Sequence, residues 1–199
     1  MRRSRSSQET RQALLEQGVT TLGRGGYHGT GIQEVLDAVG VPKGSFYNYF
    51  ESKEHFGSEV IRRFAEGVFA RMDKWLADPE GDALSALHAF HEDEIHRHDK
   101  ERIGCLFGNL GAELGETSER LQQALSEGMH GMEERFAQII RLAQEQGTVR
   151  TDLSAEKLGA FLLNHYEGAL LRMKIEGTVE PIRQVRTLIL DDFFRPRGR

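Results

Sequence analysis

Residues 30–53 read TGIQEVLDAVGVPKGSFYNYFESK, and this stretch decides the fold. In its first half, apolar residues recur at i, i+3, i+4 and i+7, which marks one buried helix face. These residues are Ile32, Val35, Leu36 and Val39. Gly40 suits the positive φ that often ends a helix, and Pro42 suits the first position of the next helix. The pattern predicts two short helices joined by a tight turn.

The start of this stretch carries a capping signal. Thr30 precedes Gln33 by three residues, which is the spacing of a capping box. We therefore expect Thr30 to cap the first helix of the pair. The free N–H groups at that helix end would suit a phosphate.

The second helix, predicted over residues 43–50, is too polar to be only a core element. Phe46 and Phe50 form its apolar side. Its other residues can reach phosphates and base edges or allow close approach: Lys43, Gly44, Ser45, Tyr47, Asn48 and Tyr49. Each of these alone is compatible with an ordinary solvated helix face, but together they predict the recognition helix of a helix-turn-helix motif.

Residues 40–50, GVPKGSFYNYF, with Ser52-Lys53-Glu54 after them, resemble the signature of the TetR family of bacterial repressors. The resemblance covers the first third of the chain and implies an all-α regulator that binds double-stranded DNA. It implies DNA contacts from Thr30, Lys43, Gly44, Ser45, Tyr47, Asn48, Tyr49 and Lys53. Lys53 matches the family's usual phosphate contact, and Asn48 stands at the variable position expected to discriminate bases.

Composition agrees with a globular regulator. The chain has 199 residues, 38% of them hydrophobic and 29% charged, and a net charge of −5. Residues 1–53 hold seven Lys/Arg and five Asp/Glu, whereas the remainder holds nineteen and twenty-six. A basic head on an acidic body suits DNA binding, because the local potential matters more than the total charge. We predict domains at 1–50 and 51–199.

No run approaches the eighteen apolar residues of a membrane span, and the N-terminus lacks an apolar signal region. The single cysteine fits a reducing cytoplasm, where we expect the protein to act, with no membrane partner.

No strand pattern is present, so the predicted fold is all-α with about nine helices. The further helices are expected at 10–22, 52–76, 83–98, a short one with Cys105 near its start, 119–146, 154–176 and 179–194. The last two are apolar enough to be core, but the family resemblance implies that they pair with their twins in a homodimer. A dimer would also match a two-fold, palindromic operator.

Residues 102–115, RIGCLFGNLGAELG, hold the only cysteine. Cys105 is expected near the start of a short helix, where the helix dipole favours the thiolate. The stretch resembles a TetR subgroup with a Gly-Cys-Leu-x-Gly-Asn-x-Gly segment, which includes repressors that respond to electrophiles of the acrylate or N-ethylmaleimide type. The resemblance implies that Cys105 is a sensor thiol for a small-molecule inducer.

The alternative is that Cys105 is a small buried residue and that the inducer is an apolar ligand bound reversibly. Under either hypothesis the predicted ligand pocket comprises Cys105, Phe107, Trp75, His91, Met129 and Tyr166. A thiol-dependent enzyme is a remote alternative, because no base–nucleophile pair supports it, and we predict that the chain is not an enzyme.

The helix predicted at 83–98 carries three residues that could serve as metal ligands. His88, Glu92 and His96 stand four residues apart, an acceptable spacing for ligands. His88 edges the apolar face, however, and His96 points well away from it. We predict no metal and no cofactor.

Overall fold

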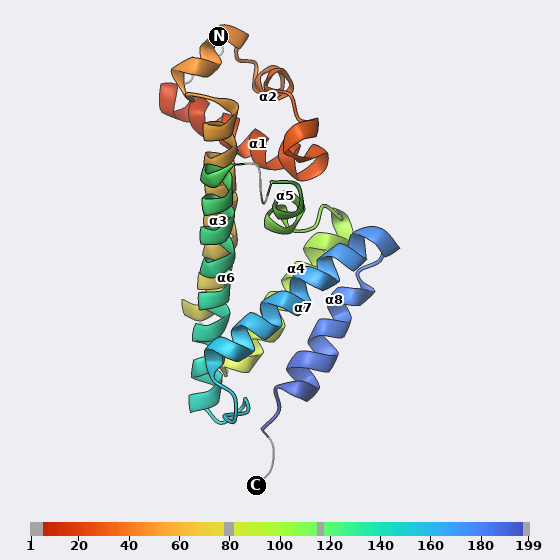
Figure 1. The fold of residues 1–199 in the computed structure, drawn as a ribbon. Coiled ribbons are helices and arrows are strands. Elements are labelled where there is room, and N and C mark those ends of the chain that lie inside the picture. Colours follow the sequence, from red (N-terminus) through yellow and green to blue (C-terminus); the bar gives the residue numbers. More distant parts are fainter. Residues whose placement is uncertain (1–5, 78–81, 115–117, 197–199) are drawn as a thin grey trace. The chain divides into compact units, whose positions relative to one another are not determined.

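The computed structural model describes residues 6–77, 82–114 and 118–196. These ranges form eight α-helices, one 3₁₀ helix (η1) and one π-helical stretch (η2), and contain no strand (Figure 1). Because η2 continues α8 without a break, the described chain has nine separate helical rods. The all-α prediction is confirmed.

The chain divides into two compact units. The head unit lies within residues 1–66 and 106–128, and the body unit within residues 67–105 and 129–199. Helices α3 (Lys53–Ala77) and α6 (Glu119–Glu145) contribute to both units. This division differs from the predicted domain limits at 1–50 and 51–199. Those limits remain a prediction about which part of the chain binds DNA and which part binds ligand and dimerises.

The head unit contains α1 (Ser7–Gly29), α2 (Ile32–Val39), η1 (Lys43–Asn48) and α5 (Leu106–Leu114), with the first parts of α3 and α6. Its core includes three aromatic rings, Phe46, Phe50 and Phe56, whose centroids are 4.9–5.7 Å apart. These buried rings pack η1 against α3, so the predicted place of Phe46 and Phe50 on the apolar side is confirmed.

Helix α1 is longer than the predicted 10–22. It begins earlier because Ser6 and Glu9 form a capping box. This capping box was not predicted from the sequence. It also continues beyond residue 22 through a glycine-rich stretch, with a kink at Gly26, where φ is 72° and ψ is 178°.

The capping box predicted at Thr30 is wrong. Helix α2 starts at Ile32 with Gly31 as N-cap, and no side chain caps it. The Thr30 hydroxyl instead donates to the Gly26 carbonyl oxygen at 2.7 Å, because it is used to hold the kinked end of α1. The prediction for Gly40 is confirmed, since it ends α2 with φ of 74°.

The recognition segment is a 3₁₀ helix over Lys43–Asn48, shorter than the predicted 43–50. Its backbone closes with bonds of the i to i+3 type, from Ser45 N–H to Pro42 and from Tyr49 N–H to Phe46, both 2.9 Å. Pro42 is the N-cap rather than the first helical residue.

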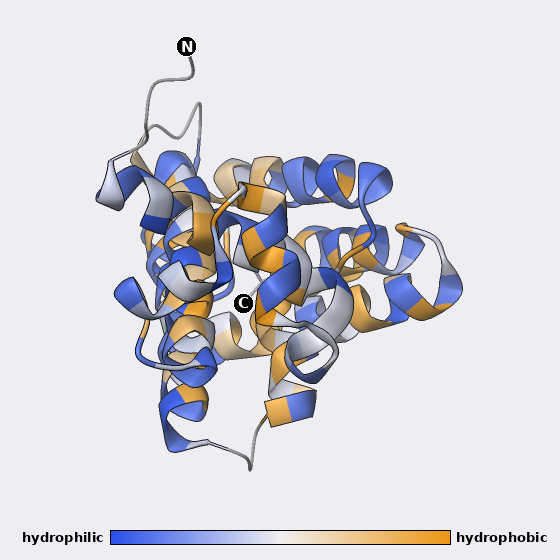
Figure 2. Ribbon diagram, turned by 90° about the horizontal axis from the view of Figure 1, so that it is seen from above, coloured by the Kyte–Doolittle hydropathy of each residue, from blue (hydrophilic) through white to orange (hydrophobic). Residues whose placement is uncertain are grey.

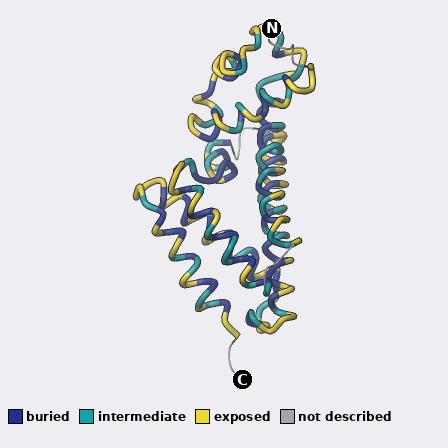
Figure 3. Tube along the Cα trace, turned by 180° about the vertical axis from the view of Figure 1, so that it is seen from behind, coloured by how far each residue is buried: buried dark blue, intermediate teal, exposed yellow. Residues whose placement is uncertain are grey.

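The body unit contains α4 (Ala83–Lys100), α7 (Ala155–Glu176), α8 (Glu180–Val185) and η2 (Arg186–Phe193), with the second parts of α3 and α6. Figure 2 shows hydrophobic and hydrophilic residues interleaved along the helices of the chain, and buried positions recur along α7 (Figure 3). The Ser154 hydroxyl caps α7 by accepting from Lys157 N–H. Most of the stretch between the helices predicted at 52–76 and 83–98 lies outside the described residues.

Candidate functional sites

The outer surface of η1 presents polar side chains over an aromatic base. Lys43, Gly44, Tyr47 and Asn48 are exposed, and Tyr47 is the most prominent aromatic side chain there at 71% exposure. Ser45 and Tyr49 are partly exposed. Nothing lies within 4 Å of a Cβ built at Gly44, so a DNA backbone could approach closely.

Two other predicted DNA contacts are engaged inside the head unit. Thr30 is buried, with its hydroxyl turned toward α1. The Lys53 ammonium donates to the Tyr27 carbonyl oxygen at 2.7 Å and lies 4.6 Å from the Tyr27 ring centroid. A phosphate contact from Lys53 would require it to share or leave this carbonyl.

The body unit buries an ionised cluster around Glu94. Its carboxylate accepts hydrogen bonds from both branches of the Arg97 guanidinium and, at 2.6 Å, from the Tyr166 hydroxyl. Arg71 Nε lies 3.5 Å away and His98 Nε2 lies 3.6 Å away. Burial opposes ionisation of Glu94, but hydrogen bonds from His98, Arg97 and Tyr166 outweigh it and hold the pKa of the carboxyl far below its ordinary value.

The same surroundings keep Tyr166 and His91 neutral. Burial and the charge of Glu94 raise the pKa of Tyr166, so its hydroxyl remains a donor. Burial lowers the pKa of His91 to about 4, against hydrogen bonding to the Leu87 carbonyl and the nearby Glu94 charge. The His91 and Tyr166 ring centroids lie 5.6 Å apart.

Several buried polar atoms of this cluster lack a protein partner. His91 Nε2 and His98 Nδ1 hydrogen-bond to none of the described residues, although both side chains are almost fully buried. Glu167 Oε1 is a third such atom. Buried polar atoms without partners are costly and commonly mark a place that a ligand or water completes.

Cys105 lies beside this cluster. It is buried, directly precedes α5, and hydrogen-bonds to the Glu167 carboxyl. Burial raises the pKa of Glu167, although the hydrogen bond from Cys105 acts in the opposite direction. The thiol also interacts electrostatically with Arg97 and Tyr166. The position before a short helix is confirmed.

The structure therefore brings together Cys105, His91 and Tyr166 of the predicted pocket, and places the others elsewhere. Phe107 belongs to the head unit, where its ring meets Phe64 with centroids 5.0 Å apart. Trp75 and Met129 are half-buried residues of the body unit.

Arg97, Glu167 and Glu94 were not among the residues predicted from the sequence. A charged residue within the apolar stripe of 83–98 was the only available signal, because the partners on α7 are more than sixty residues away.

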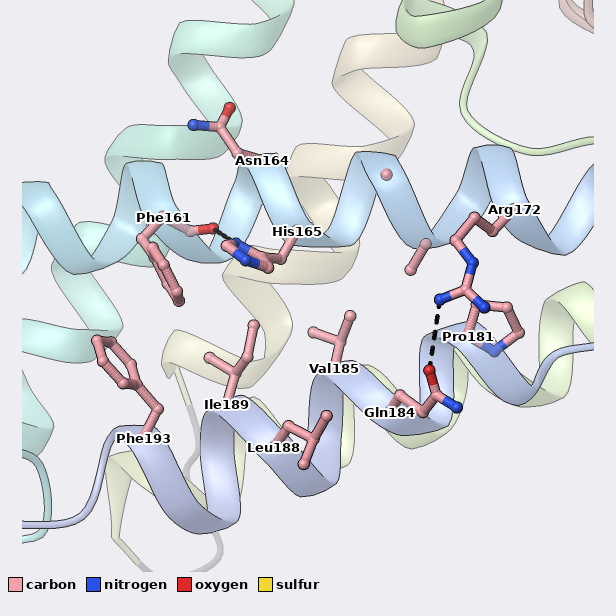
Figure 4. Close-up of a pocket in the computed structure, with 12 residues that line it drawn as sticks. Phe161, Asn164, His165, Arg172, Pro181, Gln184, Val185, Leu188, Ile189 and Phe193 are labelled. Carbon is pink, nitrogen blue, oxygen red and sulfur yellow. Dashed lines mark hydrogen bonds between the residues drawn. The ribbon is translucent and has the colours of Figure 1, made fainter.

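A groove of about 570 Å³ runs between α7 and the α8–η2 rod (Figure 4). The Phe161 and Phe193 rings stack at one end with centroids 4.8 Å apart, and Arg172 Nη1 reaches Gln184 Oε1 at 3.5 Å at the other. Its apolar floor includes Val185, Leu188 and Ile189.

The residues weighed as metal ligands have other partners. His88 Nε2 lies 3.4 Å from Asp191, and the His96 ring bonds to the Glu92 carbonyl of its own helix. Within the ranges that the structure describes, no three His, Cys, Asp or Glu residues are grouped to hold a metal ion. None of the described helices is long and apolar enough to cross a membrane.

A helix-turn-helix surface on an all-α chain defines the class of DNA-binding regulators. Residues 14–60 match the model for bacterial regulatory proteins of the tetR family, and residues 82–189 match the model of the tetracyclin repressor-like C-terminal domain. The chain belongs to the TetR family of transcriptional regulators.

Named relatives agree with this assignment. The transcriptional repressor DhaR of Mycobacterium sp. (strain GP1) is 35% identical over 181 residues, which cover 91% of this chain and 90% of DhaR. The transcriptional regulator AcuR of Cereibacter sphaeroides is 36% identical over 86% of this chain and 79% of AcuR. A crystal structure of the reduced form of Escherichia coli NemR matches with a TM-score of 0.84 and 28% identity, over 90% of this chain and 94% of that one. These relatives are named as regulators of transcription, not as enzymes.

Proposed function

We propose that the chain is a homodimeric repressor that binds a palindromic operator in the bacterial cytoplasm and releases it when a small molecule acts at Cys105. The observation that carries the DNA-binding part is the exposed polar face of η1 over its buried aromatic base. Lys43 would contact a phosphate or guanine, Tyr47 and Tyr49 the backbone and thymine methyl groups, and Asn48 a base edge.

The groove between α7 and the α8–η2 rod supports the dimer. Ile175 on α7 and Leu188 on η2 are large apolar side chains that are 76% and 63% exposed, and Leu188 lines the groove. A second copy of the same two elements would cover them and form a four-helix interface.

Sedimentation of a Leu188→Arg variant tests the dimer. A charge in the interface core should convert the dimer to monomer and abolish operator binding, whereas Leu142→Arg, at an exposed leucine of α6, should leave both intact. A dimeric Leu188→Arg variant would contradict this interface.

Cys105 and its neighbours support an electrophilic inducer. The thiol would react with an α,β-unsaturated carbonyl compound by conjugate addition. The Cys105 sulfur would bond to the β-carbon while the C=C π bond breaks. The thiol proton would end on the α-carbon, so no oxidant is required. The adduct would add volume to a tightly packed, charged region and thereby disturb the body unit.

N-ethylmaleimide tests this step. Mass spectrometry should find one adduct per chain, since Cys105 is the only cysteine. The adduct should weaken operator binding, and a Cys105→Ser variant should keep its operator affinity in the presence of the reagent. Adduct formation without loss of binding would remove the sensor role.

A reversible ligand is the second candidate, favoured by the buried atoms His91 Nε2 and His98 Nδ1 that lack protein partners. Such a ligand would hydrogen-bond to these nitrogens beside the Phe90 and Phe136 rings. Full response of Cys105→Ser to the native inducer would decide for this candidate.

A further inference from the structure

Glu113, near the end of α5, clasps a distant stretch of backbone in the head unit. Its Oε2 atom accepts from Tyr27 N–H at 2.8 Å, and its Oε1 atom accepts from His28 N–H at 2.6 Å. One carboxylate thus satisfies two consecutive backbone donors. Hydrogen bonds to a charged acceptor are about twice as strong as neutral ones.

The clasped backbone has a shape that needs support. At Gly26, φ of 72° with ψ of 178° lies in a region that is essentially restricted to glycine. A Cβ at this position would stand 2.6 Å from Glu113 Oε2, so the carboxylate uses the space that glycine leaves. Because α1 kinks here, the next N–H groups begin a new turn and require acceptors from outside the helix.

Two more hydrogen bonds hold the same segment. The Lys53 ammonium donates to the Tyr27 carbonyl, and the Thr30 hydroxyl donates to the Gly26 carbonyl, each at 2.7 Å. Residues 26–30 lead directly into α2, the first helix of the helix-turn-helix. The orientation of that motif therefore depends on a segment held by a carboxylate from α5 and an ammonium from α3.

The position of Glu113 along the chain gives the clasp a regulatory meaning. Helix α5 starts at Leu106, the residue after Cys105, and the division between the two units falls at this peptide. A rearrangement at Cys105 therefore acts on the first turn of the helix that carries Glu113.

We propose that Glu113 is the positioning residue that sets residues 26–30 for DNA binding, and that inducer action at Cys105 lowers DNA affinity by withdrawing its carboxylate. The second half of this statement rests on the proposed function of Cys105, whereas the first half does not. Withdrawal leaves the Tyr27 and His28 N–H groups without their acceptor. The kinked segment then loses its fixed shape, and α2 and η1 lose their fixed orientation.

The test compares Glu113→Ala and Glu113→Gln with a matched control, Glu127→Ala. Glu127 is another carboxylate of the head unit, but it is half-exposed and pairs only with Arg62 among the ion pairs described, at 3.4 Å. Fluorescence anisotropy would measure binding to DNA from the protein's own promoter region. Each protein would be measured before and after complete modification of Cys105 by N-ethylmaleimide.

The proposal predicts that unmodified Glu113→Ala binds DNA at least tenfold more weakly than wild type. Glu113→Gln should lie between them, because its amide keeps one acceptor oxygen and replaces the other with a donor. Glu127→Ala should stay within twofold of wild type. Modification should weaken wild type strongly but change the affinity of Glu113→Ala little, because the clasp is already absent.

A Glu113→Ala variant that binds like Glu127→Ala would overturn the proposal. A variant that binds weakly but keeps the wild-type ratio between unmodified and modified affinity would show a purely structural role, and would also overturn it. If wild type does not respond to modification, the sensor role of Cys105 fails, while the comparison of the unmodified variants still decides the positioning role.

Amide hydrogen exchange keeps the test decisive if Glu113→Ala does not fold. In Glu113→Gln, exchange at one of the Tyr27 and His28 amides should accelerate at least tenfold, because only one acceptor oxygen remains, while the core amides of α3 stay protected. Unchanged protection at both amides would show that the clasp does not hold them.

Discussion

The two units of this protein place their polar side chains in opposite ways. In the head unit, aromatic residues fill the interior, and Lys43, Tyr47 and Asn48 stand outside on η1. In the body unit, Glu94 and His91 are buried, and they contact Tyr166 from a helix more than sixty residues away. The side chains that bind DNA must be exposed to solvent in the unbound protein. A buried charged cluster is stable only in one arrangement of its partners, because each charge depends on the others for compensation. The body cluster is accordingly the part most sensitive to a small chemical change.

Removal of Glu94 should break the body unit most severely. Glu94→Ala leaves the buried Tyr166 hydroxyl and the Arg97 guanidinium, whose side chain is 40% exposed, without their common partner. Loss of one member of a fully buried ion pair typically costs about 3–5 kcal/mol, and because solvent screens the exposed part of Arg97 we expect about 2–4 kcal/mol here. Urea unfolding followed by circular dichroism would measure the free energy of unfolding. A loss below about 1 kcal/mol, the range of exposed pairs, would show that the cluster is as solvated as the head surface.

Substitution of a tightly packed glycine should destabilise the head unit by a smaller amount, because the new side chain clashes with a buried ring. In Gly128→Ala the new Cβ would stand 2.4 Å from the buried Phe107 ring, so we expect a loss of about 1–3 kcal/mol in the free energy of unfolding.

The matched variant is Gly111→Ala, on a helix of the same unit with open space around its Cβ. Its free energy of unfolding should rise by about 0.5–1 kcal/mol, because alanine has a higher helix propensity than glycine. Thermal unfolding of both variants would check the difference, and equal behaviour would mean that Phe107 is not packed against α6.

Acid should weaken the body unit through His91. The folded state lowers the pKa of His91 to about 4 from an ordinary value of 6.5. Below pH 6.5, His91 is therefore protonated in the unfolded chain but stays neutral in the folded chain. The free energy of unfolding falls as the pH falls toward 4. Between pH 7 and pH 5 this amounts to about 2 kcal/mol.

His91→Phe should remove that part of the pH dependence, since a phenyl ring does not titrate. Urea unfolding at the two pH values would measure it. A variant that loses as much stability as wild type between pH 7 and pH 5 would show that another group is responsible.

The smallest effects concern the exposed face of η1. Lys43→Ala should weaken binding to every DNA sequence by about 1 kcal/mol and reduce the salt slope of the binding constant by about 1, with no change in folding stability. Asn48→Ala should instead change the preference between operators. Anisotropy titrations at several salt concentrations would check both, and an unaltered slope for Lys43→Ala would exclude a phosphate contact there.

The sequence allowed prediction of most of the head unit, because its signals are local. The apolar spacing from Ile32 to Val39, the glycine at 40 and the pair Phe46 and Phe50 each act within a few residues, and the structure agrees. The capping box at Thr30 failed because a side chain can cap its own helix or support the preceding one, and local spacing does not distinguish the two.

The body cluster and the Glu113 clasp could not be predicted in the same way. Glu94 meets Tyr166 and Glu113 meets Tyr27 across separations of more than seventy residues. Such pairings follow from tertiary packing, which a single sequence does not encode in any short pattern. Cys105 was identified as a candidate from its motif, but its partner Glu167 was not.

The central claim is that chemistry at Cys105 controls DNA affinity. The most direct measurement is the anisotropy of labelled DNA from the protein's own promoter region, titrated with wild type and with Cys105→Ser, each with and without N-ethylmaleimide. We expect tight binding by both proteins and loss of binding after treatment in wild type alone. Equal binding by treated and untreated wild type, with Cys105 fully modified, would contradict it.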